Sequence, residues 1–448
     1  MTHARSSADL AVADIVSRGH DMHRLASELF PLTRSLTGAG YRRTLELLEA
    51  VSGPMQRHRF ATGERVLDWQ IPPEWTIRDA WIKAPDGSTV VTLAECNLHV
   101  VGYSTPVHRR LALTELQQHL HSLPEQPTAI PYRTSYYAGQ WGFCLTDEQR
   151  RTLPDGEYEV LIDADLGPGA VELGEVVFEG SGDGEVLLWT YCCHPSMANN
   201  ELSGPVVAAH LAALLRERER PRHTYRIVFG PETIGSIAYL SRFGERLAAR
   251  LVAGYVLTCA GDPGPFTYKR SRRGDSLADR IAEHVLTCLG AEHSVLDFVA
   301  VGSDERQFCS PGYNLPVGSL MRTMYGNYPE YHTSLDDLSL ITPQALGETL
   351  RAYEQIVAAL EANETLVGTV LYGEPQLGRR GLYPSTGGPS AALHAGRQQD
   401  MLTLLNFCDG GADLLAAAEA TGRPLLELAE AAEMLREHDL LRPVSPAS

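Results

Sequence analysis

Lysine is nearly absent from this sequence, and paired cysteines and long apolar runs are absent altogether. Only Lys83 and Lys269 are lysines in a chain of 448 residues with 38 lysines and arginines, which disfavours a mechanism built on a lysine side chain. The eight cysteines form no Cys-x-x-Cys pair, so we predict neither a disulfide framework nor a structural zinc finger. No apolar run approaches the roughly 20 residues that span a bilayer, so we predict no membrane-spanning helix.

Positive charge is also scarce. The chain carries 56 acidic and 38 basic side chains, a formal net charge of −18, which opposes nonspecific binding to nucleic acid or to an anionic membrane surface. Residues 1–14 are too polar for a signal peptide, so we expect a cytoplasmic protein. With 44% apolar and 21% charged residues, the composition is that of a globular protein, and the length predicts two or three domains.

The order of local patterns predicts the architecture. Helical periodicity over residues 9–52 gives way to short β-like stretches and Pro-rich loops from 55 to 160. From 158 to 345, strand-length apolar runs alternate with helical patterns, which is typical of buried parallel strands with crossover helices and predicts an α/β sandwich. A Gly/Pro-rich stretch over 372–388 is typical of a linker. The short helical patterns over 398–443 resemble a winged-helix module.

These patterns divide the chain into three domains. We assign residues 1–55 and 160–370 to the α/β domain, 56–159 to a small β-rich insertion, and 371–448 to the winged-helix-like domain. The sequence contains no Gly-x-Ser-x-Gly elbow, no phosphate-binding loop and no His-Glu-x-x-His helix, which argues against several common enzyme chemistries.

Polar side chains follow the apolar runs of the α/β part, at the points where strands should end. His194 and Glu201 follow one run, Glu232 and Asp262 follow the next two, and His332 lies in a later polar loop. Ligands of an open parallel sheet bind at the carboxyl ends of its strands, and imidazole and carboxylate groups are ligands of divalent metals. Each residue alone is more often structural, a histidine by packing and an acid as a helix cap. Their joint order is harder to obtain by chance and indicates a metal site.

The segments around these residues resemble a known superfamily, that of the zinc aminopeptidases and glutaminyl cyclases. The strongest matches are CHPSMANNELSG (193–204), PETIGS (231–236), GSDERQFCSPG (302–312) and EYHTSLDD (330–337). Within the superfamily, the chain is most similar to bacterial aminopeptidase-like proteins that carry a lid insertion and a C-terminal winged helix. The resemblance implies a zinc-aminopeptidase-like α/β/α sandwich with a small β-rich lid insertion and a C-terminal winged-helix domain.

The resemblance also implies a ligand set for one or two zinc ions. In the superfamily, a first histidine, a bridging aspartate, a Glu-Glu pair, an aspartate and a last histidine hold the metal. His194 matches the first ligand and His332 the last. The bridging position is Asn200, a neutral and poorer ligand, although the neighbouring Glu201 could supply the carboxylate. The Glu-Glu pair is reduced to Glu232, which cannot be both general base and metal ligand.

Further candidates complete the implied site. Asp262 matches the aspartate ligand only by its position after a strand. Asp304 and Glu305 are candidates for the missing general base, but an equally good interpretation is a salt-bridged helix start. Arg306 could bind a substrate carboxylate with two hydrogen bonds.

Three tyrosines bracket the last histidine. A phenol from Tyr325, Tyr328 or Tyr331 could contact the substrate or stabilise a tetrahedral oxyanion, although we expect at least two of the three to have packing roles. Asn200 is a further candidate for substrate contact.

We therefore predict a zinc-dependent aminopeptidase-like hydrolase that cleaves an amide or peptide bond of a small substrate through a metal-activated water. Two alternatives stay open, a metal-poor binding protein without catalysis and a zinc-dependent cyclase or amide-rearranging enzyme. Residues 398–443 hold three arginines against nine acids, so we expect no nucleic-acid partner. The small apolar residues over 412–420 suggest a homo-oligomer.

Overall fold

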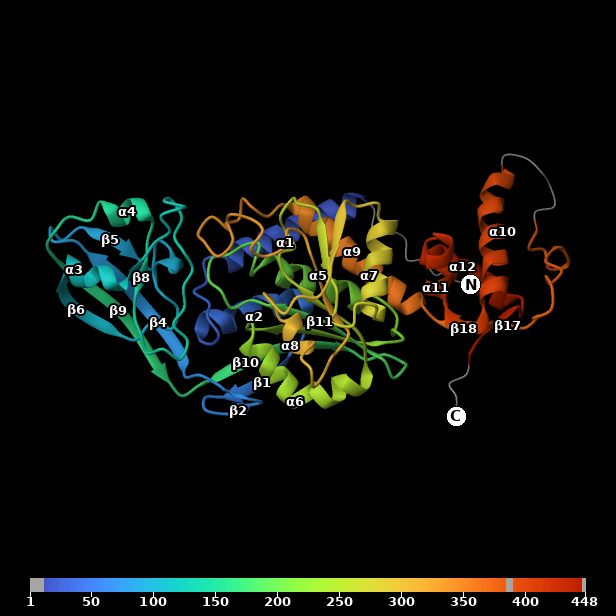
Figure 1. Ribbon diagram of the computed structural model, residues 1–448, viewed down its shortest axis with the longest axis horizontal. Helices are drawn as coiled ribbons and strands as arrows, with labels where there is room; N and C mark the ends of the chain where they lie inside the picture. The colour runs from blue at the N-terminus through green and yellow to red at the C-terminus, as the bar shows by residue number, and fades with distance from the viewer. Residues whose placement is uncertain (1–11, 384–389, 445–448) are drawn as a thin grey trace. The chain divides into compact units, whose positions relative to one another are not determined.

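The computed structural model describes residues 12–383 and 390–444 (Figure 1). Most of the N-terminal stretch that we judged too polar for a signal peptide, and part of the predicted 372–388 linker, lie outside the described residues. None of the helices in the described part of the chain combines the length and the apolar character needed to cross a membrane. The chain divides into two compact units, residues 8–279 with 292–351, and residues 280–291 with 352–448.

The larger unit is built on a mixed sheet. The described residues form eight strands of this sheet, in spatial order β1 (Gln56–Ala61), β10 (Ala170–Phe178), β12 (Thr224–Gly230), β11 (Glu185–Tyr191), β13 (Leu251–Leu257), β16 (Val317–Met321), β14 (Phe266–Lys269) and β15 (His293–Leu296). The neighbours from β12 to β16 run parallel, whereas β1, β10 and β12 pair antiparallel, as do β16 and β14. The predicted α/β class is confirmed, with antiparallel pairs added on both sides of a parallel centre.

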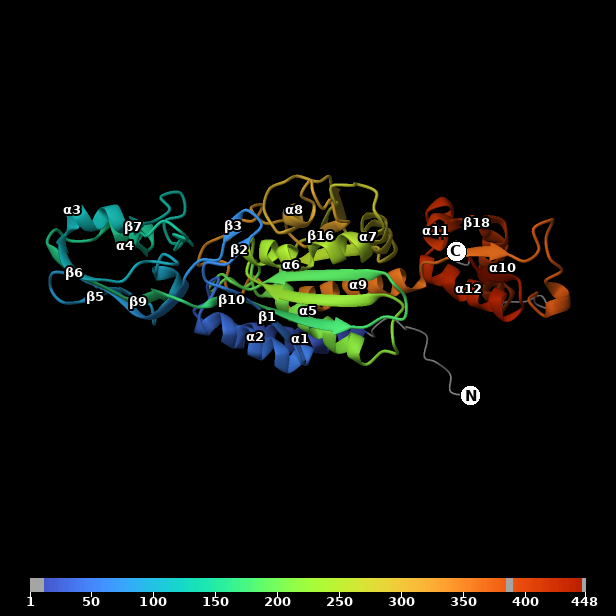
Figure 2. The same cartoon turned by 90° about the horizontal axis from the view of Figure 1, so that it is seen from below.

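Helices cover both faces of this sheet (Figure 2). The helices that lie wholly in this unit are α1 (Val12–Leu29), α2 (Ala39–Ser52), α5 (Ser203–Arg216), α6 (Ile234–Arg250) and α8 (Glu305–Phe308). Helices α7 (Leu277–Cys288) and α9 (Pro343–Ala362) begin in this unit and continue into the smaller one. Helices α1, α2 and α5 lie on one face, and α6 and α8 lie on the other (Figure 2). Every residue of β11 and β12 is buried, which explains why these strands are nearly continuous apolar runs rather than alternating ones.

The insertion is a separate antiparallel sheet in the order β5-β4-β9-β6. Its elements are β4 (Glu74–Lys83), β5 (Thr89–Thr92), β6 (Val107–Ala112) and β9 (Glu157–Gly167), the short pairs β2 (Arg65–Val66) with β3 (Trp69–Gln70) and β7 (Leu120–His121) with β8 (Phe143–Cys144), the helices α3 (Leu113–Leu116) and α4 (Asp147–Arg151), and the 3₁₀ turns η1 (Asn97–His99) and η2 (Gln117–His119). We refer to residues 62–169 as the lid.

Two edges of the lid differ from the ranges predicted from sequence. The predicted insertion began at residue 56, but β1 pairs with β10 in the central sheet. It ended at 159, but β9 continues in the lid sheet to Gly167. Strand composition does not reveal which sheet a strand joins, because pairing depends on distant partners.

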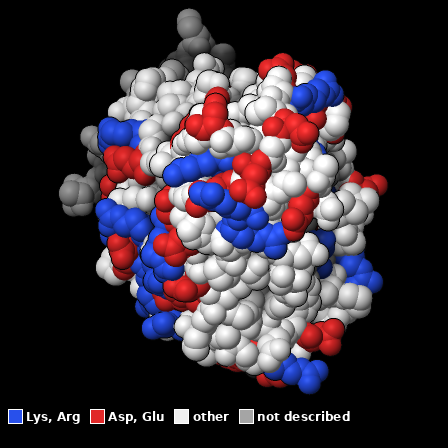
Figure 3. All heavy atoms as spheres, turned by 90° about the vertical axis from the view of Figure 1, so that its left-hand side faces the viewer, with Lys and Arg blue, Asp and Glu red and all other residues white. Residues whose placement is uncertain are grey.

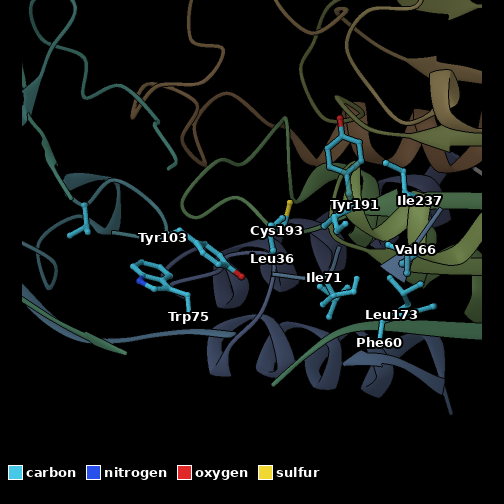
Figure 4. Packing of buried hydrophobic residues seen from close by; sticks show 14 of the residues in the cluster. Leu36, Phe60, Val66, Ile71, Trp75, Tyr103, Leu173, Tyr191, Cys193 and Ile237 are labelled. Atoms are coloured by element: carbon cyan, nitrogen blue, oxygen red, sulfur yellow. The ribbon is translucent and has the colours of Figure 1, made fainter. Parts of the chain in front are cut away.

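One apolar core connects the lid to the central sheet. Its buried residues include Trp75 and Tyr103 from the lid, Leu36 from the segment between α1 and α2, and Tyr191 and Cys193 at the end of β11 (Figure 4). The Trp75 and Tyr103 rings stack with their centroids 5.8 Å apart. This shared core holds lid residues close to the carboxyl end of β11.

The smaller unit contains the elements expected of a winged helix. They are β17 (Thr365–Gly368), η3 (Gly378–Arg380), α10 (Ser390–Phe407), β18 (Asp409–Asp413), α11 (Leu414–Thr421), α12 (Leu425–Glu437) and β19 (Leu441–Pro443). The strands form a sheet in the order β18-β17-β19. Strand β17 falls in a range that we had assigned to the α/β domain.

The surface carries charges of both signs. Figure 3 shows lysine and arginine side chains interspersed with aspartate and glutamate over one face of the molecule. On the lid sheet, Arg78 pairs with Asp163 and Asp165, and Glu159 accepts hydrogen bonds from His108 and Arg110. Such pairing leaves little unbalanced positive charge to attract a polyanion.

Candidate active site

The first candidate ligand lies at the end of β11, where the chain turns back on itself. The backbone N–H of His194 donates to Glu201 Oε2 at 2.8 Å, and the Nδ1 of its ring pairs with Glu201 Oε1. Arg34, which is 1% exposed, donates from Nε to the His194 carbonyl at 3.0 Å. A side chain at Gly204 would come within 2.2 Å of the Leu257 carbonyl, so glycine allows α5 to begin close against β13. The loop therefore brings the Glu201 carboxylate back to the imidazole.

Glu232 lies at the equivalent end of β12, just before a strained residue. Thr233 has φ 61° and ψ −73°, a conformation that is costly for a β-branched side chain. The buried Asp304 holds it there by accepting from Thr233 N and Ser236 Oγ, each at 2.8 Å, and from Trp189 Nε1 at 2.7 Å. The turn places Glu232 Oε2 3.7 Å from His194 Nε2.

His332 approaches from the opposite loop with its own unusual backbone, at φ 57°. Its ring centroid lies 5.3 Å from that of His194 and 3.9 Å from that of Tyr331, on which it stacks. Tyr132 of the lid contacts both histidines, with centroid distances of 4.5 Å to His194 and 5.3 Å to His332. Tyr132 also donates its backbone N–H to the His332 carbonyl at 2.9 Å. The lid therefore helps to position the two imidazoles.

Asp336 joins the last loop to the first one. Its carboxylate accepts from the backbone N–H of Asn199 at 2.6 Å and of Asn200 at 3.0 Å, and from Tyr328 Oη at 3.3 Å. Burial raises the pKa of this carboxyl to about 6, against the lowering effect of those donors. Asp336 lies in the matched EYHTSLDD segment, but sequence reasoning gave it no role, since the two backbone N–H groups that donate to it lie more than 130 positions away.

Several predicted site residues lie in separate networks. Asp262 accepts from Asn199 Nδ2 at 3.0 Å, Thr323 Oγ1 at 2.6 Å and the Gly264 N–H at 2.9 Å. These donors come from neighbouring loops, so the structure uses Asp262 to connect those loops. It does not bring Asp262 into the group of ligand atoms around His194.

Glu305 and Tyr325 belong to a network centred on Lys269, one of the two lysines. The Lys269 ammonium is fully buried, pairs with Glu305 and Tyr325, and donates to the Val301 carbonyl at 3.0 Å. Tyr325 Oη in turn donates to Glu305 Oε1 at 3.2 Å. The structure therefore engages Glu305 and Tyr325 in holding the segment before α8, and Asp304 in holding Thr233.

A pocket of about 410 Å³ opens at the edge of the sheet. It is lined by Leu36, Trp69, Tyr136, Tyr137, Cys193, His194, Glu232, Thr233, Ile234 and Arg306. Arg306 donates from Nη2 to Thr233 Oγ1 at 3.2 Å, while its Nε is buried and finds no hydrogen-bond partner in the described part of the chain. The aromatic residues contributed by the lid had no signal in the sequence, because nothing local shows that the lid reaches this pocket.

The electrostatics of the site follow from burial and close charges. Burial raises the pKa of Glu232 to about 8, although His194 acts against this increase. Burial also disfavours the charged form of His194, but the neighbouring Glu201 outweighs that effect and raises its pKa. Burial and the proximity of His194 lower the pKa of His332 to about 3. His332 is therefore a neutral imidazole at neutral pH, the form that can bind a metal.

The donor set fits a metal ion. Within the described residues, ligand atoms of Cys193, His194 and Glu201 lie within 4.8 Å of one another. Two further atoms, His332 Nε2 and Asn200 Oδ1, are buried and have no hydrogen-bond partner among the residues that the structure describes. Buried polar atoms without partners cost roughly 1–3 kcal/mol each, so a bound cation would relieve an otherwise unfavourable arrangement. Imidazole nitrogens with a carboxylate are donors that suit zinc.

Comparison with solved structures identifies the class of fold. The chain superposes on BSAP, a zinc aminopeptidase from Bacillus subtilis, with a TM-score of 0.54 at 13% identity, covering 76% of this chain and 94% of that one. A peptidase M28 precursor from Shewanella amazonensis gives a TM-score of 0.53 at 12% identity, covering 77% and 94% of the two chains. At these identities the likeness shows the fold alone, which is the predicted aminopeptidase-like α/β/α sandwich.

A family model described as a domain of unknown function (DUF4910) matches residues 23–363, and a winged helix-turn-helix model matches residues 364–443. The chain belongs to the DUF4910 family and carries a C-terminal winged-helix domain, as the resemblance implied. A Clostridium acetobutylicum protein, provisionally named a polysaccharide biosynthesis protein with an aminopeptidase-like domain, is 42% identical over 95% of this chain and 96% of its own length. A crystal structure of a provisionally named peptidase from the same organism gives a TM-score of 0.89 at 40% identity, covering 96% and 98% of the two chains.

Proposed function

We propose that this chain is a zinc-dependent hydrolase that cleaves an amide or peptide bond of a small substrate. The observation that carries the proposal is that two carboxylates flank the His194 ring beside a pocket, Glu201 at Nδ1 and Glu232 at Nε2. The partnerless Nε2 of His332 supports a further ligand from the opposite loop. Aminopeptidase-like fold neighbours, one of them named a zinc aminopeptidase, support the choice of metal.

The residues that would hold the ion are His194, Glu201 and His332, with Glu232 either as a ligand or as a base. A zinc ion held there supplies a Lewis acid that polarises the amide carbonyl and makes a water more acidic. In this proposal Glu232 accepts the proton of the attacking water, since it lines the pocket and lies beside the His194 ring.

Two further residues would orient the substrate, Arg306 in the pocket and Tyr331 beside His332. Arg306 holds a carboxylate or another anionic group, because its guanidinium lines the pocket and its Nε has no hydrogen-bond partner in the described chain. Tyr331 keeps its phenolic proton at neutral pH, because burial and the nearby Glu232 raise its pKa, so it can donate a hydrogen bond to a developing oxyanion.

The pocket also limits the size and class of the substrate. Its volume is at the small end of the usual range for ligand pockets, which favours a molecule of the size of a dipeptide or one sugar unit. Trp69 and Tyr137 of the lid, 42% and 57% exposed, provide an aromatic wall. The provisional name of the Clostridium relative favours an amide attached to a sugar among these possibilities.

Metal content and turnover together test the proposal. Protein purified without chelator should contain about one or two zinc ions per chain and should hydrolyse at least one member of a panel of aminoacyl amides, dipeptides and N-acyl amino sugars. Glu232→Gln should abolish turnover. If Glu232 is the base, the variant keeps its zinc, and if Glu232 is a ligand, the variant loses it. Glu217→Gln, an exposed glutamate directly after α5, is the matched control and should change neither quantity.

A non-catalytic metabolite-binding protein is the second candidate. Asn200 favours it, because a neutral amide occupies the position at which the resemblance implies a bridging carboxylate. Protein that stays free of zinc after zinc is added, and that hydrolyses none of the panel, would support this candidate and overturn the hydrolase.

A further inference from the structure

Cys193 directly precedes the first candidate ligand, and its sulfur is at the centre of the site. Its Sγ lies 3.3 Å from His194 Nδ1 and within 4.8 Å of the nearest Glu201 carboxylate oxygen. The side chain is 1% exposed and also lines the pocket. Figure 4 shows it next to Leu36 among the buried apolar residues. Cys193 is part of the apolar cluster that joins the lid to the central sheet. Its sulfur, however, contacts His194 Nδ1 and the backbone N–H of Glu232.

The spacing of these atoms matches that of two ligands on one ion. Sulfur and nitrogen ligands bind zinc at about 2.3 Å and 2.0 Å, so in a tetrahedral site they lie about 3.5 Å apart. The observed separation of Cys193 Sγ and His194 Nδ1 is 3.3 Å. We propose that Cys193 is itself a metal ligand of this site and contributes a thiolate beside His194 and Glu201. This inference rests on the proposed function, since it takes the ion of that site to be zinc.

Burial and the nearby Glu201 and Glu232 raise the pKa of the Cys193 thiol, so the thiolate requires the bound ion. A second contact would stabilise that thiolate once the ion is bound. The backbone N–H of Glu232 donates to Cys193 Sγ at 3.3 Å. Hydrogen bonds from backbone amides to a ligating sulfur stabilise its negative charge and fix its direction. The same turn that positions the Glu232 carboxylate therefore also contacts the Cys193 sulfur and helps to orient it.

The charge of the site gives a reason for the extra ligand. Asn200, at the position of the implied bridging aspartate, brings no charge, and its Nδ2 points to Cys259 Sγ at 3.9 Å. A thiolate from Cys193 restores one negative charge to the donor set. A sulfur ligand also selects zinc over magnesium or calcium, which prefer oxygen donors.

The neighbouring cysteine provides a matched control. Cys192 is fully buried, and burial, followed by the nearby Glu201, raises the pKa of its thiol to about 12. It is not part of the group of ligand atoms found in the described chain. If Cys193 is a ligand, its replacement should change metal binding, and replacement of Cys192 should not. If both cysteines only pack in the core, the two replacements should have similar effects.

Cobalt substitution tests the inference on the full-length chain. Cobalt(II) bound by a thiolate shows an intense near-ultraviolet charge-transfer absorption that nitrogen and oxygen ligands do not give. We would add one equivalent of cobalt to metal-free protein in a Cys288→Ser background, because Cys288 is exposed and could bind cobalt nonspecifically. The absorption should appear in this background and with Cys192→Ser, and should be absent with Cys193→Ser. We expect Cys193→Ser to raise the zinc dissociation constant by at least about tenfold.

The outcomes separate this inference from the proposed function. One-to-one cobalt binding without the absorption, or an absorption unchanged in Cys193→Ser, would remove Cys193 from the ligand set and leave the zinc hydrolase in place. Failure of both zinc and cobalt to bind would overturn both proposals. Turnover by metal-free protein that Cys193→Ser abolishes would make the thiol a nucleophile and would also overturn both. If Cys193→Ser does not fold, the cobalt spectra of Cys288→Ser and of its Cys192→Ser derivative still show whether a thiolate other than Cys192 binds the ion. Both variants leave Cys193 unchanged.

Discussion

At the scale of single residues, the site concentrates buried polar atoms that have few partners. His332 Nε2 and Asn200 Oδ1 lack hydrogen bonds within the described residues, and the Glu201 carboxylate, fully buried, faces the His194 ring. Evolution rarely retains such atoms without a compensating contact, because each one costs stability. The backbone of His332 is held in a left-handed conformation, with φ 57°. Such strain costs stability and is common at functional sites.

Removing either imidazole tests this interpretation. His194→Ala or His332→Ala deletes about a quarter to a third of a three- or four-ligand site, so both variants should lose bound zinc and turnover together. Zinc is measured per chain by elemental analysis, and turnover is measured on the same preparations. His20→Ala, an exposed histidine on α1, should keep both. Full zinc and full turnover in both site variants would rule out the metallohydrolase.

At the scale of elements, the turn from β12 into α6 is the part of the site with the most demanding geometry. Thr233 adopts its strained conformation where it must separate Glu232 from the first turn of α6. Asp304 satisfies the Thr233 N–H and the Ser236 hydroxyl and is itself held by Trp189. The structure therefore gives Asp304 a positioning role, acting through Thr233 on the Glu232 carboxylate.

Asp304→Asn tests the positioning role. The amide keeps one acceptor oxygen but turns an NH₂ group toward donors, so the unfolding free energy should fall by about 1–3 kcal/mol. We expect zinc content to be unchanged and kcat to fall more than KM changes, since the ligands stay while Glu232 shifts. Equilibrium unfolding, elemental analysis and steady-state kinetics measure these quantities. A loss of stability with unchanged kcat would show that Asp304 is purely structural.

A second element-scale feature is an ion cluster at the antiparallel side of the sheet. Glu175 on β10, 2% exposed, accepts from His58 on β1 at 2.6 Å, Arg226 on β12 at 2.8 Å and Tyr239 on α6 at 2.7 Å. Burial disfavours its charge, but these three donors outweigh burial and lower its pKa to about 2. The cluster ties three strands and a helix together.

This shift predicts a pH dependence of stability. A carboxyl whose pKa is depressed by folding stabilises the protein above its unfolded pKa, near 4.5, and this contribution is lost as the pH falls from about 4.5 to 2. The shift corresponds to about 3 kcal/mol. Glu175→Gln should lower the unfolding free energy by about that amount at pH 7 and flatten its slope below pH 4.5, as measured by urea unfolding. Glu245→Gln, exposed on α6, is the control. Its unfolding free energy should show the same pH dependence as that of the unsubstituted protein.

At the scale of the whole molecule, the winged-helix unit uses its arginines internally. Arg423 pairs with Asp400 at 2.7 Å and Glu427 at 2.5 Å, and Arg436 pairs with Glu364 at 2.9 Å and Glu433 at 2.8 Å. These side chains balance acids of the same unit instead of forming a basic face. That this unit does not bind nucleic acid stays a prediction.

The full-length chain should not bind duplex DNA with submicromolar affinity at physiological salt, because its formal net charge of −18 opposes the approach of phosphates. Fluorescence anisotropy with a labelled random duplex over a series of salt concentrations measures this. Tight binding that weakens steeply as salt rises would show a phosphate-binding surface and contradict the expectation.

Light scattering over a range of concentrations on the same preparation tests the expected homo-oligomer.

The sequence by itself determined the α/β sandwich, its approximate strand positions and the strand ends at which the chemistry lies. Strand β13 coincides with the apolar run at 251–257, and His194 and Glu232 follow β11 and β12 as expected. The order of the motifs along the chain also indicated the family. Such features are readable because hydrophobic period and strand length are local properties of a chain.

Only the tertiary structure decided which side chains meet. It directed Asp262 and Glu305 into networks with Asn199 and Lys269, brought Tyr132 from the lid onto both histidines, and turned the sulfur of Cys193 toward His194. It also added antiparallel pairs to the predicted parallel sheet. The direction of a side chain after a strand depends on one residue of register and on partners that can lie more than a hundred positions away. Local pattern carries no record of either.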